Sequence, residues 1–405
     1  MMKYAIQITA SSLVSAMGSG KNAHLSALKS HQTGLKNTLV SLDPRLDSFY
    51  GEVTQVNQVE LPEALQKYHC RNNQLAWMAL QTDQFFEAVE AAKQKYGASR
   101  IGLAVGTSTS GILETEQAWQ HKSPEGEFDA GYHYETTHRM NSLADFCADA
   151  LEIYGPRIVI STACSSSAKV FASASRWIDH DLVDAVIVGG VDTLCLTTIH
   201  GFNALGLVNP DIVKPLNCDR KGINIGEAGG FMLLEKVDGN STNIQLSGFG
   251  ESSDAYHIST PHPQGQGAKN AMEEALQMAG LNSSQIDYLN LHGTGTQSND
   301  RAEARAVNGL FGENKPMLSS TKGYTGHTLG AAGITEAVFC QLALENQLAF
   351  PNLNLESLDP ELNLNPITET TTTEIRHCMS NSFGFGGNNA SLIFSLAQNA
   401  EGARR

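Results

Sequence analysis

The chain has 405 residues, of which 41% are hydrophobic and 17% are charged, a composition typical of a globular protein with a substantial core. Acidic residues outnumber basic ones 42 to 27, and a net charge of −15 argues against a nucleic-acid-binding protein. The seven cysteines include no Cys-x-x-Cys pair, which indicates a reduced compartment and neither a disulfide framework nor a zinc site. The segment 1–21 is a poor signal peptide, and no run of about 20 apolar residues predicts a membrane span. We therefore expect a soluble, cytoplasmic protein.

Strand-like and helix-like segments alternate along the chain. Apolar, β-branched runs predict strands at 3–10, 100–108, 156–162, 184–192, 229–237 and 390–396. Apolar residues at helical spacing predict helices at 72–94, 165–178, 268–280 and 331–346. Strands separated by helices predict an α/β fold with covered sheets. The pattern breaks at 234–245, and we predict two tightly packed halves, residues 1–245 and 246–405.

Cys164 lies where a buried-looking strand is predicted to turn into a helix. The strand 156–162 precedes it and the helix 165–178 follows it, so Ala163 and Cys164 form the turn and the thiol lies at a helix N-terminus. The positive end of the helix dipole and the free backbone N–H groups favour a thiolate there. Small neighbouring residues leave room for a bulky thioester. A buried structural cysteine is the alternative, but the flanking sequence favours a nucleophile.

A first histidine, His292, follows the apolar strand 286–291 and begins the run His-Gly-Thr-Gly-Thr. The glycines hold the backbone in a sharp turn that directs the ring into a cleft. Thr294 and Thr296 offer hydroxyl groups that could bind an extended polar ligand. The alternative is a turn histidine that caps the next helix.

A second histidine, His327, stands in a glycine-rich run, 322–333, that leads into the helix 331–346. Lys322 and Glu336 bracket the histidine and could set its charge and orientation. A surface ion pair near a helix start is the alternative. One thiol and two imidazoles on tight turns are what carbon–carbon bond formation between thioesters needs.

The run 381–389 places glycines around Phe383 and Phe385. Its backbone N–H groups could bind an oxyanion, although a structural β-turn would also explain the pattern. The run 18–21, Gly-Ser-Gly-Lys, lacks the leading glycine and the trailing Ser or Thr of a phosphate-binding loop. No His, Cys and Asp cluster has the spacing of metal ligands, so we expect no metal site.

Together these motifs resemble those of the β-ketoacyl-acyl carrier protein synthases, the elongating condensing enzymes of the thiolase-like superfamily. The likeness covers almost the whole chain and includes 162–167, 188–194, 214–235, 252–257, 292–296, 322–333 and 381–389. The resemblance implies a five-layered αβαβα fold of two pseudo-symmetric halves, a dimer, and Cys-His-His catalysis. It implies no metal or organic cofactor, because the departing carbon dioxide drives carbanion formation.

The resemblance also implies a role for each motif residue. Cys164 would take an acyl chain from the phosphopantetheine thioester of an acyl carrier protein. His292 and His327, supported by Lys322 and Glu336, would bind the malonyl thioester and stabilise the enolate that forms on decarboxylation. The N–H groups of Cys164 and Phe385 would form the oxyanion hole, and Phe385 would gate the malonyl pocket. Substrate contacts are expected at Thr294, Thr296, Asp254 and Phe383.

Departures from the commonest family pattern leave the pathway open. Thr109 stands where the acyl-pocket loop of the family often has an apolar residue, and the run 214–230 differs from that of housekeeping elongation enzymes. These variants resemble the branch associated with aryl polyene pigments, whose ketosynthase can pair with a chain-length-factor-like subunit. Fatty-acid elongation by a homodimer and elongation by such a heterodimer both remain open. The alternative function is a noncatalytic chain-length-factor-like subunit, which the presence of Cys164 disfavours.

The resemblance implies an acidic acyl carrier protein as the partner. Because this chain is itself acidic, docking would need a local basic patch near the mouth of the active-site tunnel. We predict Arg71, Lys214, Arg220 and Lys221 as candidates for this patch, with solvated surface charge as the alternative.

Overall fold

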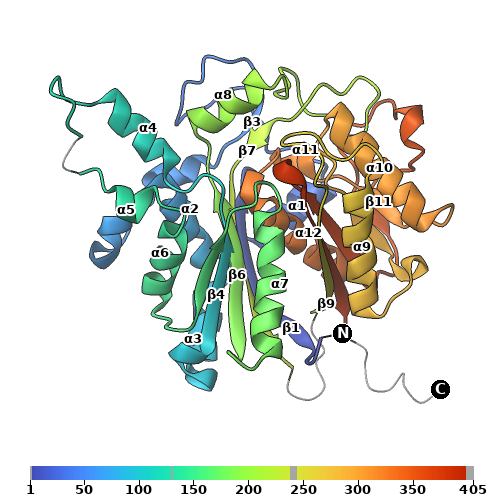
Figure 1. Cartoon of the computed structure of the whole chain (residues 1–405), viewed down its shortest axis with the longest axis horizontal. Helices are drawn as coiled ribbons and strands as arrows, with labels where there is room; N and C mark the ends of the chain where they lie inside the picture. The colour runs from blue at the N-terminus through green and yellow to red at the C-terminus, as the bar shows by residue number, and fades with distance from the viewer. Residues whose placement is uncertain (1, 129–130, 238–243, 398–405) are drawn as a thin grey trace.

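The computed structural model describes residues 2–128, 131–237 and 244–397. Figure 1 shows a long twisted strand path with helices in front of it, behind it and at its ends. The main strands are β1 Ile6–Ser15, β4 Ile101–Gly106, β5 Arg157–Ile160, β6 Ala185–Asp192, β8 Ala228–Lys236, β9 Ile244–Ser253, β10 Tyr288–Asn290, β11 Met317–Ser319, β14 His377–Phe383 and β15 Asn388–Leu396. The short strands are β2 Gly18–Ser19, β3 Tyr50–Gly51, β7 Ile225–Gly226, β12 Leu348–Ala349 and β13 Thr371–Thr372.

The α-helices alternate with these strands. They are α1 Lys21–Lys29, α2 Arg71–Leu80, α3 Phe85–Tyr96, α4 Ile112–Gln120, α5 Tyr134–Thr137, α6 Ser142–Leu151, α7 Ser166–Asp179, α8 Leu196–Ala204, α9 Gln266–Ala279, α10 Gln297–Phe311, α11 Lys322–Thr325 and α12 Ala332–Asn346. No helix in the described ranges has both the length and the apolar composition needed to cross a bilayer.

The strand path consists of two halves with the same topology. The first half runs β1-β8-β6-β4-β5 and the second runs β9-β15-β14-β10-β11, joined by a short β1–β9 pairing. In each half the first two pairings are antiparallel and the last two are parallel. This repeat is the expected pseudo-symmetry. The second half begins with β9 at Ile244, whereas the division at residue 245 remains a prediction.

Two central helices separate the halves. Both α7 and α12 contact strands of both halves, while α2, α3 and α6 cover the outer face of the first half and α9 and α10 cover that of the second. Helix α12 is buried on all sides along most of its length, as a central helix requires. The resulting order of layers is the predicted αβαβα arrangement.

The N-terminus of α7 is packed against three glycines. A Cβ at Gly106 of β4 would lie 2.5 Å from the Ser167 nitrogen, and a Cβ at Gly190 of β6 would lie 2.4 Å from the Ser167 Cβ. A Cβ at Gly333 of α12 would lie 2.4 Å from the Ala168 nitrogen. Only glycine fits at these positions, and the first turn of α7 is thereby fixed between the two halves.

Two local predictions are wrong. The predicted helix 72–94 is interrupted between α2 and α3, where Asp83 and Gln84 adopt positive φ angles of 56° and 57°. The strand predicted as buried, β5, instead lies at the end of the sheet with Arg157 and Ile158 exposed. An apolar run alone does not distinguish a central strand from an edge strand that another surface can cover.

Candidate active site

Cys164 lies in the predicted turn between β5 and α7. Ala163 adopts a positive φ of 52°, Ser165 is the N-cap of α7, and Cys164 is 5% exposed. A left-handed conformation at a non-glycine residue is strained, and such strain is typical of functional turns. The turn holds the sulfur where the two halves of the molecule meet.

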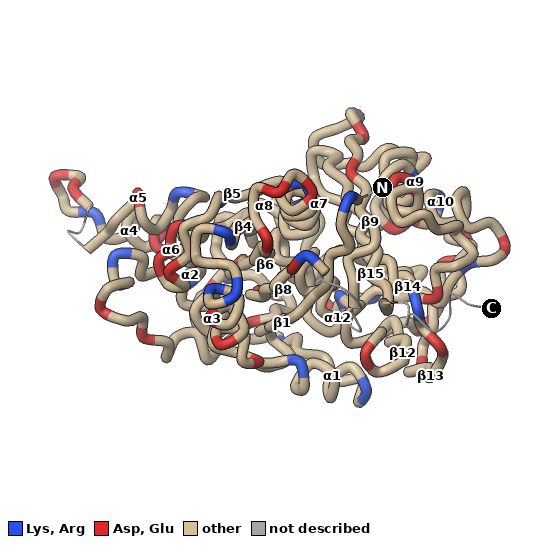
Figure 2. Tube along the Cα trace, turned by 90° about the horizontal axis from the view of Figure 1, so that it is seen from below, with Lys and Arg blue, Asp and Glu red and all other residues tan. Residues whose placement is uncertain are grey.

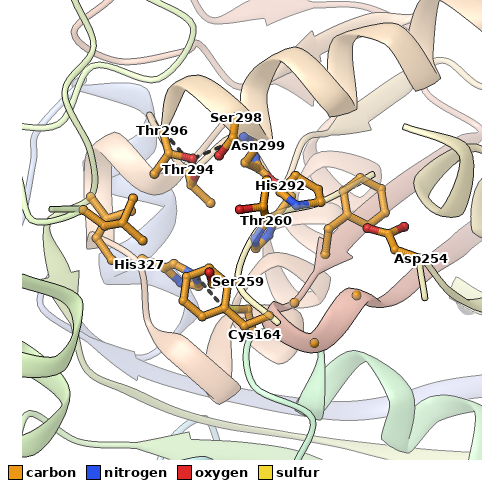
Figure 3. A pocket seen from close by; sticks show the side chains of 18 of the residues that line it. Cys164, Asp254, Ser259, Thr260, His292, Thr294, Thr296, Ser298, Asn299 and His327 are labelled. Atoms are coloured by element: carbon orange, nitrogen blue, oxygen red, sulfur yellow. Dashed lines mark hydrogen bonds between the residues drawn. The ribbon is translucent and has the colours of Figure 1, made fainter. Parts of the chain in front are cut away.

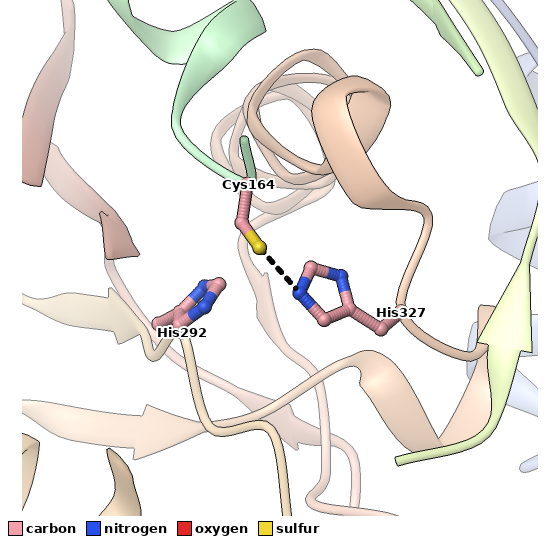
Figure 4. A group of neighbouring side chains, drawn as sticks. All are labelled: Cys164, His292 and His327. Carbon is pink, nitrogen blue, oxygen red and sulfur yellow. Dashed lines mark hydrogen bonds between the residues drawn. The ribbon is translucent and has the colours of Figure 1, made fainter. Parts of the chain in front are cut away.

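The two predicted histidines converge on this sulfur (Figure 4). His327 Nε2 lies 3.0 Å from Cys164 Sγ, and the His292 and His327 ring centroids are 5.3 Å apart with nearly perpendicular planes. Ligand-type atoms of all three residues lie within 4.8 Å of one another. His292 comes from the loop after β10, and His327 from the loop between α11 and α12.

Backbone and lysine donors determine which ring nitrogen carries the proton. The Leu329 N–H donates to His327 Nδ1 at 3.2 Å, so the neutral His327 ring carries its proton on Nε2. Lys322 Nζ lies 3.3 Å from His292 Nδ1, and because an ammonium can only donate, the His292 proton is also on Nε2. The His327 Nε2–H therefore faces the Cys164 sulfur, and the neighbouring His292 ring also has its N–H group on Nε2.

The positions of the ring protons on His292 and His327 also affect whether the two residues can bind a metal. Cysteine and two histidines are a donor set that suits Zn²⁺. A metal ligand must offer a lone pair, however, and both Nε2 atoms carry protons. The arrangement fits hydrogen-bond donation to a substrate oxygen better than metal coordination.

Burial controls the ionisation of the three residues. It raises the pKa of the Cys164 thiol to about 11, opposed by the Lys322 charge and by the N–H groups of Phe385 and Cys164. Burial together with the Lys322 charge holds the pKa values of His292 and His327 well below their usual range. The resting site thus contains a thiol and two neutral imidazoles, whereas the helix terminus alone would favour a thiolate.

Lys322 and Glu336 form a buried ion pair beside His292. Lys322 Nζ contacts both a Glu336 carboxylate oxygen and the His292 carbonyl oxygen. Burial raises the pKa of Glu336 to about 7, and the Lys322 charge opposes the shift. The sequence placed this pair near His327; in the structure its direct histidine contact is with His292.

A second buried carboxylate, Glu303 of α10, holds the backbone at His292. Its oxygens accept the N–H groups of His292 at 2.9 Å and Gly293 at 2.8 Å, and Asn381 Nδ2 donates to it at 3.1 Å. Burial raises its pKa to about 7. Glu303 could not be singled out from the sequence, because the N–H groups that it accepts are brought to it only by folding.

The glycine-rich loop 384–387 closes the site above Cys164. The Phe385 N–H lies against the Cys164 sulfur and favours its ionised form. The Phe385 ring lies 5.4 Å from that of Phe202 on α8, and Gly386 has a positive φ of 76°. The backbone N–H groups of Phe385 and Cys164 both lower the pKa of the Cys164 thiol, so both groups lie close to its sulfur.

Two cavities meet at Cys164, and Phe385 lines both. The first, here called the histidine cavity, is narrow and contains both histidines (Figure 3). Its wall includes Asp254, Ser259, Thr260, Thr294, Thr296, Ser298, Asn299 and Phe383. The second, here called the α8 cavity, is wider and is lined by Ser108, Ala163, Thr197, Thr198, Gly201, Phe202, Leu205 and Leu329.

Most of the predicted substrate contacts lie in the histidine cavity. The hydroxyls of Thr294 and Thr296 are 2.9 Å apart, and Thr296 also caps α10 by accepting the Asn299 N–H. Asp254 accepts hydrogen bonds from Asn389 Nδ2 and the His262 N–H. The Phe383 ring lies edge-on to His292 with the centroids 6.0 Å apart. Ser259 and Thr260 of a loop, and Ser298 and Asn299 of the first turn of α10, were missed because isolated polar residues carry no distinctive pattern.

The structure places Thr109 outside the acyl pocket in which the sequence had placed it. Its side chain is buried and donates to Asp192 at 2.9 Å, and it lines neither of the two cavities. Its neighbour Ser108 lines the α8 cavity instead. The sequence located the right loop but not which side chain of the loop faces the cavity.

Two of the four predicted docking residues are also wrong. Arg71 is buried, with its Nε 3.0 Å from a Glu227 oxygen, and Arg220 is buried between Asp300 at 3.3 Å and Asp359 at 2.8 Å. Buried, paired guanidinium groups cannot form a docking surface. Acidic and basic positions are both scattered along the chain trace in Figure 2.

The fold and the site together define a thiolase-like condensing enzyme, an acyltransferase with a cysteine nucleophile and two histidine N–H donors. Two family models match the chain, "Beta-ketoacyl synthase, N-terminal domain" over residues 8–239 and "Beta-ketoacyl synthase, C-terminal domain" over residues 244–356. The chain belongs to the beta-ketoacyl synthase family, and the predicted family, fold and reaction class are confirmed.

Similar proteins agree with this assignment. The 3-oxoacyl-[acyl-carrier-protein] synthase 2 of Vibrio cholerae is 34% identical over 73% of this chain and 76% of its own. The 3-oxoacyl-[acyl-carrier-protein] synthase 1 of Haemophilus influenzae is 29% identical over 96% of this chain and 98% of its own. A chain in the solved structure of a ketosynthase in complex with its chain length factor from Xenorhabdus doucetiae is 39% identical, with a TM-score of 0.88 and coverage of 97% of this chain and 98% of that one.

Proposed function

We propose that this chain elongates an acyl group by decarboxylative condensation with malonyl-acyl carrier protein, giving a 3-oxoacyl-acyl carrier protein. One observation carries the proposal. Cys164 Sγ lies 3.0 Å from His327 Nε2, and ligand-type atoms of Cys164, His292 and His327 lie within 4.8 Å of one another.

In the first half-reaction Cys164 attacks the thioester of an acyl-acyl carrier protein. The Cys164 sulfur forms a bond to the acyl carbon, the phosphopantetheine sulfur leaves, and the thiol proton goes to that leaving sulfur. The N–H groups of Cys164 and Phe385 stabilise the tetrahedral oxyanion. The acyl chain then lies in the α8 cavity, whose wall is mainly apolar.

In the second half-reaction a malonyl thioester occupies the histidine cavity. Its thioester carbonyl oxygen accepts both Nε2–H groups, so the enolate formed on loss of carbon dioxide is stabilised as its charge develops. The enolate carbon bonds to the acyl carbon and Cys164 leaves as a thiolate, which takes a proton from water. The low pKa values of both imidazoles keep them as neutral donors.

We propose a chain-length-factor-like subunit as the dimer partner and the edge strand β5 as the contact. The exposed Ile158, at 39%, leaves an apolar strand edge without a partner among the described residues. An exposed apolar edge is a site for pairing with another chain. The similar Xenorhabdus doucetiae complex contains such a subunit, which favours the specialised, aryl-polyene-like pathway over primary fatty-acid elongation.

Lys214 and Lys221 remain the proposed carrier-protein contacts. The Lys221 side chain is 58% exposed and lies 2.9 Å from Asp211, and that of Lys214 is 22% exposed and lies 2.9 Å from Glu356. Lys221→Glu should slow carrier-protein association and weaken its salt dependence. Lys29→Glu on α1 is the control, and equal kinetics in the two variants would remove Lys221 from the docking site.

The alternative of a noncatalytic subunit is disfavoured because the nucleophile, both histidines and both supporting carboxylates are in place. The deciding experiment is intact-protein mass spectrometry of the wild type and Cys164→Ala with a panel of saturated and aryl-polyenoyl carrier-protein thioesters. Acyl mass on the wild type alone supports the nucleophile, and the preferred acyl group identifies the pathway. No acylation in the presence of a partner subunit, with no release of carbon dioxide, would support the noncatalytic role.

A further inference from the structure

Asp192, at the end of β6, is a fully buried carboxylate that the proposed mechanism does not use. Its oxygen atoms accept hydrogen bonds from two segments. Thr107, Ser108 and Thr109 supply hydroxyl and backbone donors, with distances of 2.7 Å from the Thr107 hydroxyl and 2.8 Å from the Ser108 N–H. Gly330 supplies a backbone N–H at 2.6 Å.

The partners of Asp192 in the described ranges are neutral N–H and O–H groups, and no ion pair to it is found there. A buried carboxylate needs its lone pairs satisfied, and hydrogen bonds to a charged acceptor are about twice as strong as neutral ones. The carboxylate therefore fixes both segments firmly, and each of the two oxygens has a defined set of donors.

One oxygen, Oδ2, connects the wall of the α8 cavity to His327. It accepts the Ser108 hydroxyl, and Ser108 lines that cavity. It also accepts the Gly330 N–H, and the adjacent Leu329 N–H is the donor that fixes the proton of His327 on Nε2. A Cβ at Gly330 would lie 2.7 Å from Oδ2, which shows how closely this turn approaches the carboxylate.

We propose that Asp192 is a positioning residue that holds the His327 tautomer needed for decarboxylation and ties it to the acyl-binding wall. The inference rests on the proposed function. Asp192 does not touch the reacting atoms; it acts through the turn 328–330. The loop 107–109 and the turn that holds His327 are consequently parts of one rigid unit. A substitution in the wall of the α8 cavity should therefore also change the position of His327.

Asp192→Asn tests this role because it keeps the shape and replaces one acceptor oxygen with an NH₂ donor. We expect release of carbon dioxide from malonyl-acyl carrier protein to fall about 10- to 100-fold, the usual cost of a misplaced catalytic group. Acylation of Cys164, followed by intact mass, should change less than about threefold because the oxyanion hole is retained. Asp287→Asn is the matched control, since Asp287 also accepts backbone N–H groups, at Arg376 and His377, away from the site.

Thr107→Val removes one hydroxyl donor to Asp192 without altering either cavity wall, and it serves if Asp192→Asn does not fold. It should show the same separation of the two half-reactions with a smaller loss. Equal losses in acylation and decarboxylation, or no loss in either, would overturn the inference. Wild-type protein that neither becomes acylated nor releases carbon dioxide would instead refute the proposed function itself.

Discussion

Replacing Lys322 with methionine removes the ammonium that pairs with the buried Glu336 carboxylate. Even with Lys322 present, burial raises the pKa of Glu336 from 4.5 to about 7. Without that cation the native carboxyl group should remain protonated to still higher pH. The double variant Lys322→Met with Glu336→Gln has the same apolar replacement but no carboxyl group to titrate.

The structure gives the sign and size of the difference in pH-dependent stability between the single and the double variant. Above pH 4.5 the unfolded chain releases the Glu336 proton while the native chain keeps it, so the free energy of unfolding falls as pH rises. In the wild type this fall ends near pH 7, where native Glu336 ionises. In Lys322→Met it should continue, by about 1.4 kcal/mol per pH unit relative to the double variant, or about 3 kcal/mol over two units above neutrality.

The assay is urea unfolding of both variants at several pH values between 6 and 9. Parallel stability profiles for the single and double variants would refute the reasoning, because native Glu336 would then already be ionised, as it is in the unfolded chain. The double variant should regain stability at high pH but not decarboxylation, because His292 Nδ1 still lacks its Lys322 donor. Recovered decarboxylation would show that Lys322 does not set the His292 tautomer.

Three further outcomes follow from the site and the sheet edge. Because burial raises the pKa values of Glu303 and Glu336 to about 7, decarboxylation should fall as pH falls through 7, and the histidines should add no inflection at 6.5, since burial holds their pKa values well below it; a pH–rate profile that is flat through pH 7 would contradict this. Glu303→Gln should reduce decarboxylation about 10-fold or more, because the turn at His292 is then held less firmly. The control in the same assay is Glu274→Gln, which loses an acceptor for the Glu251 N–H. Ile158→Glu should convert the dimer to separate subunits in sedimentation experiments, whereas Val40→Glu at another exposed position should not, and an intact Ile158→Glu dimer would move the interface away from β5.

The nucleophile, both histidines and the Phe385 loop could be predicted because each lies in a short run whose glycines mark a turn at the end of a strand. The strand order could not be read directly, since pairing between β1 and β9 joins residues more than 200 positions apart. The layered fold nevertheless followed from the alternation of strands and helices and from the family resemblance.

The sequence-based predictions failed mainly for charged residues, because several of them are buried in the structure. Arg71 and Arg220 carry charges that normally lie at the surface, but their partners Glu227 and Asp359 lie 156 and 139 positions away in the chain. Glu303 and Asp192 were missed for the same reason. Both carboxylates accept backbone N–H groups that folding brings to them, and no local sequence pattern predicts those hydrogen bonds.

The three glycines against the start of α7 have a consequence for how such sequences diverge. Gly106, Gly190 and Gly333 line neither cavity, yet a Cβ at each would collide with α7. Random mutagenesis with selection for activity should leave these three codons as invariant as that of Cys164. These glycines thus belong to the motifs by which this chain is recognised because the backbone of α7 needs the space, and not because of any side-chain chemistry.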